Sequence, residues 1–504
     1  MVSGRGRDSG HAAGDMTLAG NLAAAARPAG DSIWEIPPDA KPGMRVPARI
    51  YASETLFAQM DRGVFEQVTN VACLPGIVRA SLCMPDGHWG YGFPIGGVAA
   101  FRADTGIISP GGIGFDINCG MRLLRTSLTE DEVRPRLTEL VEALFRAVPT
   151  GVGAHGFVRV SASTFREVMV HGAGWCVAQG YGWPDDLEHI EGAGCLPGAD
   201  PAQVSARAID RGKEQLGTLG SGNHYLEIQV IRPGGIHDPG LARALGVGTP
   251  GQICVMLHCG SRGFGHQIGT DYLRRFDKVM AGYGITVADR ELACAPFRSK
   301  DGQAYFGAMT AAANTAFANR QVITHRVREV FARVFGRDAR ELGLSVVYDV
   351  CHNTAKVERH LVDGVETELV VHRKGATRAF GPGAPDVPAA YRDVGQPVII
   401  GGSMETGSAL LVGTARAMAE TWGSTAHGAG RTMSRTQAKR RVWGEDLIED
   451  MAARGIVVRA ASKSGVAEEA GYAYKDLSAV VDVLHRLDLS RKVVSLAPIG
   501  NIKG

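Results

Sequence analysis

The sequence predicts one large domain of the mixed α+β class, in which buried strands carry polar loops at their ends and helices pack outside the sheets. Short apolar runs that end in glycine or polar residues predict the strands, and longer segments with apolar residues three or four positions apart predict the helices. A chain of 504 residues has room for about three domains. Polar motifs that we expect at one site are nevertheless spread from residue 86 to residue 503, which favours a single domain.

The expected strands and helices alternate along most of the chain. Strands are expected at 253–257, 345–350 and 398–400 and near Val493, and helices at 137–145, 309–335 and 477–487, where Gly336 is a typical helix stop. Residues 1–31 are rich in Gly, Ala and Asp and are expected to form a mobile tail, with residues 32–504 as the folded domain.

The composition is that of an ordinary soluble globular protein, with 45% hydrophobic and 21% charged residues. A net charge of +2 is too small to give general affinity for nucleic acids, so any affinity for phosphate has to be local. No apolar run reaches about 18 residues, so we expect no membrane span. Gly20, Asn21 and Arg27 interrupt the segment 16–27, which we therefore do not interpret as a signal peptide.

The nine cysteines are scattered along the chain, their number is odd, and no CxxC pair occurs. This pattern is typical of reduced thiols in the cytoplasm, with one or more of them available as a metal ligand. We therefore expect a cytoplasmic protein.

The glycine-rich stretch 111–120, GGIGFDINCG, places the carboxylate of Asp116 three residues before the thiol of Cys119. Glycine permits tight turns, so such a loop is able to wrap closely around a small ligand. A hard oxygen beside a soft sulfur suits a borderline divalent ion such as Mn²⁺, Zn²⁺ or Fe²⁺. The alternative is a buried loop that contains a cysteine by chance.

Three histidines lie where polar loops meet apolar strands: His224 in GSGNHYLEI, His258 in VMLHCGSR and His352 in DVCHNTAK. Strand ends are rigid supports on which sites are often built. With Asp116 and Cys119 these histidines form a candidate ligand set for two metal ions, because a thiolate is able to bridge two ions. Taken singly, each histidine is more often structural than a ligand, and sequence spacing alone does not prove that the five residues converge.

Other segments point to phosphate chemistry. His427 lies in a loop of small residues shortly before Arg431 and Arg435. Imidazole is a nucleophile at neutral pH, and arginine neutralises charge on a transferring phosphorus. The backbone N–H groups of 401–404 and the basic segment 371–378 also suit an anion, although a solvated basic loop is the simpler interpretation of the second.

Two motifs allow more than one interpretation. Asp86 and His88 either orient a metal ligand or are turn-forming polar residues. The segment 151–156 matches GxGxxG, but it follows Pro149 and Thr150 rather than a hydrophobic strand, so it indicates a dinucleotide site only weakly.

Taken together, these segments resemble the signature sequences of the RtcB family of RNA ligases. The resemblance rests on GGIGFDINCGMR, LGSGNHYLEIQ, LHCGSRGFGHQIG, CHNTAK, HRKGATRAF and HGAGRTMSR, followed by the final IKG. They occur in the family's order and cover about residues 48–504, so only the N-terminal tail lies outside the resemblance.

The resemblance implies a GTP- and Mn²⁺-dependent enzyme that joins an RNA 3′-phosphate or 2′,3′-cyclic phosphate to a 5′-hydroxyl. By motif position, Asp116, Cys119 and His224 would hold one manganese ion, and Cys119, His258 and His352 the other. His427 would attack the α-phosphorus of GTP, release pyrophosphate and pass GMP to the RNA 3′-phosphate. Attack by the 5′-hydroxyl would then seal the junction. Dependence on an archease helper is a further expectation from the family.

The resemblance also implies a guanylate pocket in which Glu227 accepts from guanine, Lys503 donates to O6 and Tyr474 stacks on the base. The other implied pocket residues are Asn223, His224, Tyr225, Leu226, His352, Asn353, Gly401, Gly402, Ser403, Met404, Ser408, His427, Gly428, Ala429 and Gly430. The RNA backbone would follow basic residues without regard to base sequence, and the candidates are Arg262, Arg373, Lys374, Arg378, Arg435 and Lys439.

One segment departs from the family pattern: residues 401–409 are GGSMETGSA, where the family more often has PGSMGTASY. Gly401 is expected to loosen the loop, Glu405 to add a negative charge near phosphate, and Ala409 to remove an aromatic ring. These changes leave the metal ligands and His427 intact, but they bear on the details of the pocket and on RNA preference.

Other functions remain as alternatives. One is a dimetal phosphoesterase or a 3′-end guanylyl-capping enzyme that joins ends poorly, and another is a non-catalytic RNA-end binder. The retention of His427 and all five ligands argues against the binder. A lysine-adenylating ligase is disfavoured because the segment 300–302, KDG, lacks the spacer of a KxDG motif.

Overall fold

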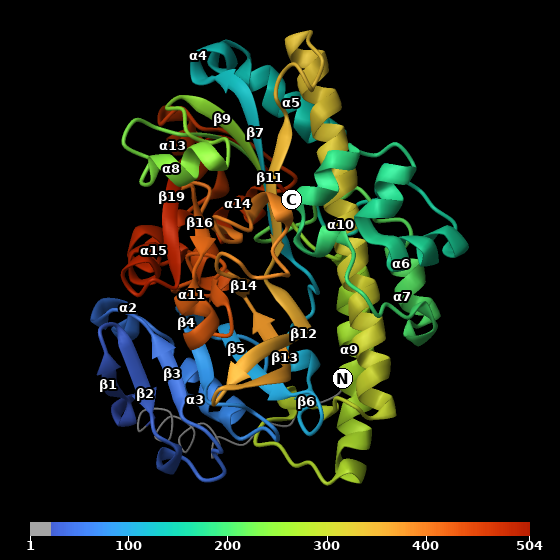
Figure 1. Ribbon diagram of the computed structural model, residues 1–504. Coiled ribbons are helices and arrows are strands. Elements are labelled where there is room, and N and C mark those ends of the chain that lie inside the picture. The colour runs from blue at the N-terminus through green and yellow to red at the C-terminus, as the bar shows by residue number, and fades with distance from the viewer. Residues whose placement is uncertain (1–21) are drawn as a thin grey trace, which may run out of the picture.

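Two mixed β-sheets form the framework of the protein, which a computed structural model describes from residue 22 to residue 504 (Figure 1). The strands of the first sheet follow the order β1 (Arg27–Gly30), β2 (Ile33–Ile36), β3 (Ala48–Tyr51), β4 (Ser81–His88), β5 (Ile95–Arg102), β13 (Val365–Lys374) and β12 (Asn353–Val362). β3 and β4 are parallel, whereas the other neighbours are antiparallel.

The second sheet carries most of the candidate site. Its order is β11 (Ser345–Cys351), β7 (Gly120–Thr129), β9 (Gln252–Cys259), β8 (Tyr225–Val230), β19 (Ser490–Lys503), β16 (Ser408–Gly413) and β15 (Pro397–Gly401), and β18 (Val457–Ala460) lies parallel to β19. The four expected strands are all present in this sheet, where their apolar side chains are buried. The predicted α+β class with mixed sheets flanked by helices is confirmed.

The two sheets meet at His352, because β11 of the second sheet ends at Cys351 and β12 of the first begins at Asn353. A separate ribbon pairs β14 (Ala376–Arg378) with β17 (Ser424–Ala426), and the chain leaves β17 directly into His427. The fold therefore delivers His352 and His427 to the same region from different strands.

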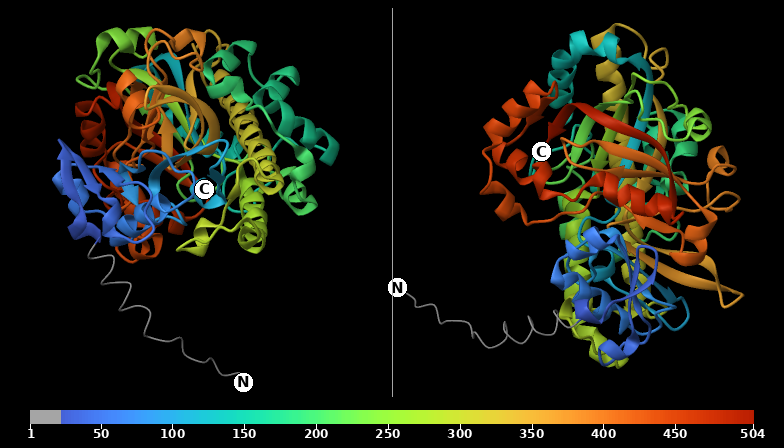
Figure 2. Two further views of the ribbon diagram at one scale, coloured as in Figure 1. Left: turned by 60° about the horizontal axis from the view of Figure 1, so that its bottom comes forward. Right: turned by 90° about the vertical axis from the view of Figure 1, so that its left-hand side faces the viewer.

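Helices cover opposite flanks of the sheets (Figures 1 and 2). One flank carries α6 (Ala162–Ala178), α7 (Ala206–Gly212), α9 (Arg262–Val279) and the long α10 (Lys300–Phe335), and the other carries α13 (Gly444–Ala453), α14 (Lys463–Glu468) and α15 (Leu477–Arg486). α10 starts earlier than expected, because the Ser299 side chain accepts from the Gly302 N–H and caps the helix there. It ends before Gly336, whose φ is +64°. The helices predicted at 137–145 and 477–487 correspond to α5 (Leu137–Ala147) and α15.

The expected mobile tail, residues 1–31, is too long. Residues 1–21 lie outside the described part of the chain, as does most of the rejected signal segment 16–27. Arg27–Gly30 instead form β1, which pairs with β2, and Leu22 is buried with the apolar core beneath these strands. A composition rich in small residues did not reveal this pairing, because edge-strand hydrogen bonds use only the backbone.

The cysteines all lie within the described residues, and none of them forms a disulfide. Among residues 22–504, no helix combines the length and the apolar character that crossing a bilayer requires.

Candidate active site

Four strand ends of the second sheet carry the predicted metal ligands to one place. β7 begins directly after Cys119, β8 begins directly after His224, β9 ends at His258 and Cys259, and β11 ends just before His352. The antiparallel register pairs Gly120 with both Cys259 and Cys351, and Tyr225 with His258. Because neighbouring antiparallel strands start and finish at the same edge, residues far apart in sequence become adjacent there.

The five predicted ligands form two overlapping groups, Asp116 with Cys119 and His224, and Cys119 with His258 and His352. Within each group the ligand atoms lie within 4.8 Å of one another. Cys119 Sγ is 3.3 Å from His224 Nε2 and 3.1 Å from His258 Nε2. The shared thiol therefore occupies the position that a bridging ligand requires.

The charge state of this cluster suits a cation. Burial lowers the pKa of His258 and of His352, and neighbouring imidazoles lower both further, so both rings are neutral at pH 7 with lone pairs to donate. Burial and the charge of Asp116 raise the pKa of the Cys119 thiol, so ligation would release its proton. Burial alone would raise the pKa of Asp116, but the adjacent His224 and Arg262 hold it below its usual range.

Two polar contacts hold His224 within the first ligand group. Asp116 Oδ2 lies 2.8 Å from His224 Nε2, whereas Asp116 Oδ1 is buried and has no hydrogen-bond partner within residues 22–504. Arg262 Nη1 lies 2.7 Å from His224 Nδ1. An orphaned carboxylate oxygen beside a thiol and neutral imidazoles is the donor set that a divalent ion such as Mn²⁺ or Zn²⁺ would complete.

The ligand loops are anchored to α10 by Arg320, which the sequence analysis did not single out. Its guanidinium donates to the carbonyl oxygens of Asn118 (2.9 Å) and Cys259 (2.8 Å) and to the carboxylate of Asp349 (2.9 Å). All of these side chains are fully buried. Asn118 has a left-handed backbone, with φ of +51°, and its side chain donates to Ala313 O. The available signal was a cluster of polar residues within the alanine-rich 309–324 segment.

A cavity of about 230 Å³ adjoins the ligand cluster. Its lining contains most of the predicted nucleotide-binding residues, namely Asn223, Tyr225, His352, Asn353, Gly401, Gly402, Ser403, Met404, His427, Gly428, Ala429, Gly430, Tyr474 and Lys503. His88, Met121, Gly375, Arg431 and Glu469 also line it, and the sequence analysis did not assign them to a pocket.

Four predicted pocket residues do not line this cavity: His224, Leu226, Glu227 and Ser408. The Leu226 side chain lies in the apolar core, because successive side chains of β8 alternate between the two faces of the sheet. Glu227 is buried, accepting from Gln229 Nε2 at 2.6 Å and from the Asn501 side chain. Burial raises the pKa of Glu227 to about 7.

His427 is held by Asp86. The Asp86 carboxylate, which is fully buried, accepts from His427 Nδ1 at 2.7 Å, from His427 N at 3.1 Å and from Gly428 N at 3.2 Å. This arrangement places the imidazole proton on Nδ1 and leaves the Nε2 lone pair available. Of the two interpretations of Asp86, an orienting role fits the structure, but the residue that it orients is His427 rather than a metal ligand. His88 lines the cavity beside it.

Glu469 organises a second group of residues in the cavity lining. It is almost fully buried and pairs with Arg431 (3.3 Å) and Arg435 (3.2 Å) while accepting from the Tyr474 hydroxyl. The guanidinium of Arg431 covers one side of the Tyr474 ring, 4.9 Å from its centre. An aromatic ring fixed in this way is suited to stacking on a base with its remaining face.

Comparison with known proteins decides the family. The family model described as tRNA-splicing ligase RtcB matches residues 67–504. The chain belongs to the RtcB family. Proteins named tRNA-splicing ligase RtcB from Archaeoglobus fulgidus, Pyrobaculum aerophilum and Thermococcus kodakarensis are 53%, 53% and 54% identical to it over 474, 477 and 472 residues. These alignments cover 94% of this chain and 98%, 98% and 97% of the respective relatives. The resemblance inferred from the motifs is thereby confirmed.

The departure at Glu405 has a different consequence from the one expected for this RtcB family member. Glu405 accepts from Gly471 N at 2.6 Å and from Arg454 Nη2 at 2.7 Å. Its charge is therefore offset by Arg454, and it links the 401–407 loop to the segment that carries Tyr474. A Cβ at Gly401 would lie 2.5 Å from the Tyr225 hydroxyl, which is the end of a side chain, so the Tyr225 ring has to shift to accept the proline that the family more often has at this position.

The predicted RNA-binding residues fall into two groups in this RtcB family member. Arg262, Arg435 and Lys439 lie near the cavity or on the exposed α12 (Arg435–Lys439) beside it. Arg373, Lys374 and Arg378 are buried: Arg373 pairs with Glu358, Arg378 with Glu191, and Lys374 donates to Gly111 O. Buried, paired cations are not available to an RNA backbone, so the expectation does not fit these three residues.

Proposed function

We propose that this protein is a GTP- and Mn²⁺-dependent RNA ligase that joins 3′-phosphate or 2′,3′-cyclic phosphate ends to 5′-hydroxyl ends. The observation that carries the proposal is His427, held by Asp86 at the wall of a cavity that adjoins the five-ligand cluster and is lined by four of its members. The names of the relatives favour tRNA splicing as the setting, and repair of cleaved RNA uses the same ends. We expect the reaction to take place in the cytoplasm.

In the first step, His427 Nε2 attacks the α-phosphorus of GTP. The new P–N bond forms as the bond between the α-phosphorus and the bridging oxygen breaks, and pyrophosphate leaves with the electron pair. Positive charge develops on the imidazole, and the hydrogen bond from Nδ1–H to Asp86 stabilises it. Arg431 and Arg435, which also line the cavity, offset the negative charge of the triphosphate.

In the following steps, GMP passes from His427 to an oxygen of the RNA 3′-phosphate, which gives an RNA(3′)pp(5′)G end. The RNA 5′-hydroxyl then attacks the 3′-phosphorus, forms the phosphodiester and releases GMP. A 2′,3′-cyclic phosphate is first opened by water. When bound by the five ligands, manganese ions would supply positive charge for the phosphoryl oxygens and lower the pKa of a bound water.

For nucleotide choice we propose that Lys503, which lines the cavity, donates to guanine O6. Glu227 is buried behind the cavity lining, so it would have to give up its hydrogen bond from Gln229 or Asn501 to accept one from the base. Arg262, Arg435 and Lys439 are the residues that we propose for the RNA backbone, because they remain near the cavity. An archease-type activator is a proposed partner.

The test is incubation of the full chain with α-labelled GTP and Mn²⁺, comparing wild type with His427→Ala. We expect an acid-labile label on the wild-type protein and none on the variant, because a phosphoramidate hydrolyses in acid. RNA with 3′-phosphate and 5′-hydroxyl ends then separates joining from capping. A metal-loaded wild-type protein that takes up no label, even with an archease present, overturns the guanylyl-histidine step and favours a dimetal phosphoesterase. Capped but unjoined RNA would favour the end-capping alternative.

A further inference from the structure

A second cavity, of about 320 Å³, lies outside the candidate active site and shares no lining residue with it. It is bounded by the N-terminal half of α10, by β12 and by Arg378 of β14. Its polar lining consists of Thr310, Lys356, Glu358, Arg378 and Asp386. Neither the proposed ligation nor its substrates use these side chains, so the cavity calls for a separate explanation.

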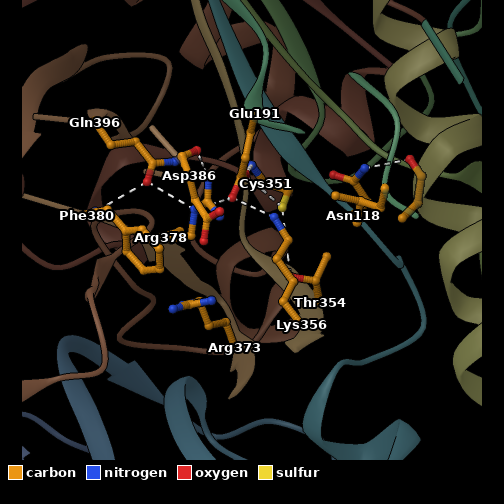
Figure 3. Close-up of polar contacts among 12 residues, drawn as sticks. Asn118, Glu191, Cys351, Thr354, Lys356, Arg373, Arg378, Phe380, Asp386 and Gln396 are labelled. Atoms are coloured by element: carbon orange, nitrogen blue, oxygen red, sulfur yellow. Dashed lines mark hydrogen bonds and ion pairs between the residues drawn. The ribbon is translucent and has the colours of Figure 1, made fainter. Parts of the chain in front are cut away.

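One carboxylate, Glu191, organises the cations at the back of this cavity (Figure 3). Glu191 Oε1 lies 2.6 Å from Lys356 Nζ and 2.9 Å from Arg378 Nε, and Oε2 accepts from Cys351 N at 3.0 Å. Glu191 is fully buried, and Lys356 and Arg378 are 8% and 6% exposed. Figure 3 shows the two cationic side chains reaching Glu191 from different directions. Since Cys351 directly precedes His352, this network adjoins the metal-ligand cluster through the backbone.

The second carboxylate of the cavity, Glu358, is also satisfied. Its two oxygens accept from Arg373 Nη1 and Nη2 at 2.7 and 2.8 Å, and Oε2 lies 3.1 Å from His360 Nε2. The carboxylates of Glu191 and Glu358 are therefore both occupied by hydrogen bonds and ion pairs within the protein. They offer little to a ligand that brings hydrogen-bond donors.

The groups that remain without partners at the cavity are donors. Lys356 Nζ has three N–H groups, and Glu191 is its only hydrogen-bond acceptor among the described residues. Arg378 donates through Nε and Nη2, to Gln396 and to Asp386 O, whereas no acceptor within residues 22–504 meets its Nη1. Thr310 Oγ1 is buried and has no partner in the same range. A buried hydroxyl without a partner is energetically unfavourable unless something bonds to it, and the same cavity is lined by two cations that have N–H groups to spare.

The charges around the cavity agree with this surplus of donors. Three buried cations, Lys356, Arg373 and Arg378, face two buried carboxylates, Glu191 and Glu358, which leaves one excess positive charge. Asp386 is the remaining carboxylate, and it is exposed at the rim, where water screens its charge.

We propose that this cavity binds a small tetrahedral oxyanion of the size of inorganic phosphate, held by Lys356, Arg378 and the Thr310 hydroxyl. Charge-assisted hydrogen bonds from an ammonium and a guanidinium to an oxyanion are among the strongest that proteins form. The oxyanion supplies acceptors to the three donor groups and balances the excess charge.

The test is isothermal titration of inorganic phosphate into the full-length protein, free of metal and GTP, with two variants and a matched control. Thr310→Val removes only the unpartnered hydroxyl and preserves side-chain shape, so we expect phosphate affinity to fall roughly 3- to 10-fold. Lys356→Gln is expected to abolish binding at this cavity. Thr315→Val is the control, because Thr315 is a buried threonine of the same helix that bonds to Ala311 O and does not line this cavity. It should bind phosphate as wild type does.

Location is tested independently by diffraction from crystals soaked in selenate, whose anomalous signal marks the anion. A peak within hydrogen-bonding distance of Lys356 Nζ and Arg378 supports the proposal. A peak only in the cavity beside His427, or equal phosphate affinity of wild type and Thr310→Val, overturns it. The Thr310→Val variant keeps the test decisive even if Lys356→Gln fails to fold, because loss of one unpaired hydroxyl leaves the packing of α10 intact.

Discussion

Asp86 provides the sharpest test of the nucleophile, because its carboxylate accepts three hydrogen bonds from His427 and Gly428. In Asp86→Asn an amide replaces the carboxylate at nearly the same volume. All three hydrogen bonds reach Oδ2, and the two backbone N–H donors keep the amide oxygen at that position, so Nδ1–H still donates and the Nε2 lone pair is retained. What the variant removes is the negative charge that stabilises the developing imidazolium.

The magnitude follows from the contact between His427 Nδ1 and Asp86, which is 2.7 Å long and buried. A hydrogen bond to a charged group contributes about 1.5–3 kcal/mol. A neutral acceptor contributes about 0.5–1.5 kcal/mol, so removal of the charge costs about 1–1.5 kcal/mol in the transition state and slows guanylylation roughly 5- to 13-fold. We expect this decrease in the rate constant of the guanylylation step. GTP affinity should change little, because Asp86 does not line the cavity.

The assay is single-turnover labelling with α-labelled GTP and Mn²⁺, followed as acid-labile radioactivity on the protein. Asp61→Asn is the matched control, since Asp61 is an exposed carboxylate just before α3 (Arg62–Ala72) and outside the cavity. A thermal melt verifies that both variants are folded. The reasoning fails if folded Asp86→Asn labels at the wild-type rate, or if Asp61→Asn is slowed to the same extent.

Three further predictions concern the metal cluster, the nucleotide loop and pH. Cys119→Ser should reduce the manganese bound per chain, measured by elemental analysis, because both ligand groups share this thiol. Cys254→Ser is the control, because Cys254 is buried outside both groups and its loss should leave the metal content unchanged. Equal metal content in the two variants would contradict the shared-ligand assignment. Glu405→Gly should raise KM for GTP roughly 3- to 10-fold with a smaller change in kcat, because the hydrogen bond from Gly471 N to Glu405 is lost. An unchanged KM in steady-state kinetics would show that this hydrogen bond does not position the nucleotide loop. Burial raises the pKa of Glu227 to about 7, so the folded state holds a proton that the unfolded state releases above its ordinary value of about 4.3. Its stabilising contribution is therefore complete below about pH 4 and is lost as pH rises through about 7, by on the order of 3 kcal/mol. Urea unfolding at pH 5 and pH 8 should show a smaller pH difference for Glu227→Gln than for wild type, and an equal difference would refute this attribution.

The local structure around the site was largely predictable from the sequence. The runs at 253–257 and 345–350 form β9 and β11, because a short apolar run that contains β-branched residues is typical of a strand with both faces covered. The helix expected at 309–335 is present as part of α10, because apolar residues three or four positions apart lie on one face of a helix and are buried there. The metal-ligand types were also visible, since carboxylate, thiol and imidazole recur where strands end.

The charged residues of the sequence were the least reliable indication of where phosphate or RNA binds. Arg373 and Arg378 belong to a basic segment that resembles a phosphate-binding loop, but each is buried against a carboxylate from elsewhere in the chain. Sequence reveals the cation without revealing its partner, because Glu358 and Glu191 reach these residues only through strand pairing and packing. Glu405 shows the same limit, since Arg454 offsets the charge that was expected to face phosphate.

By itself, the sequence determined the strands, the helices, the chemistry of the ligands and the membership of a ligase family. These follow from side-chain type and from periodicity over a few residues, which are local properties. Only the tertiary structure decided that Asp86 holds His427, 341 positions away, and that Arg320 anchors the ligand loops. Such contacts depend on the register of antiparallel strands and on the packing of α10 against them. Two residues that meet across that distance carry no short-range signal of each other.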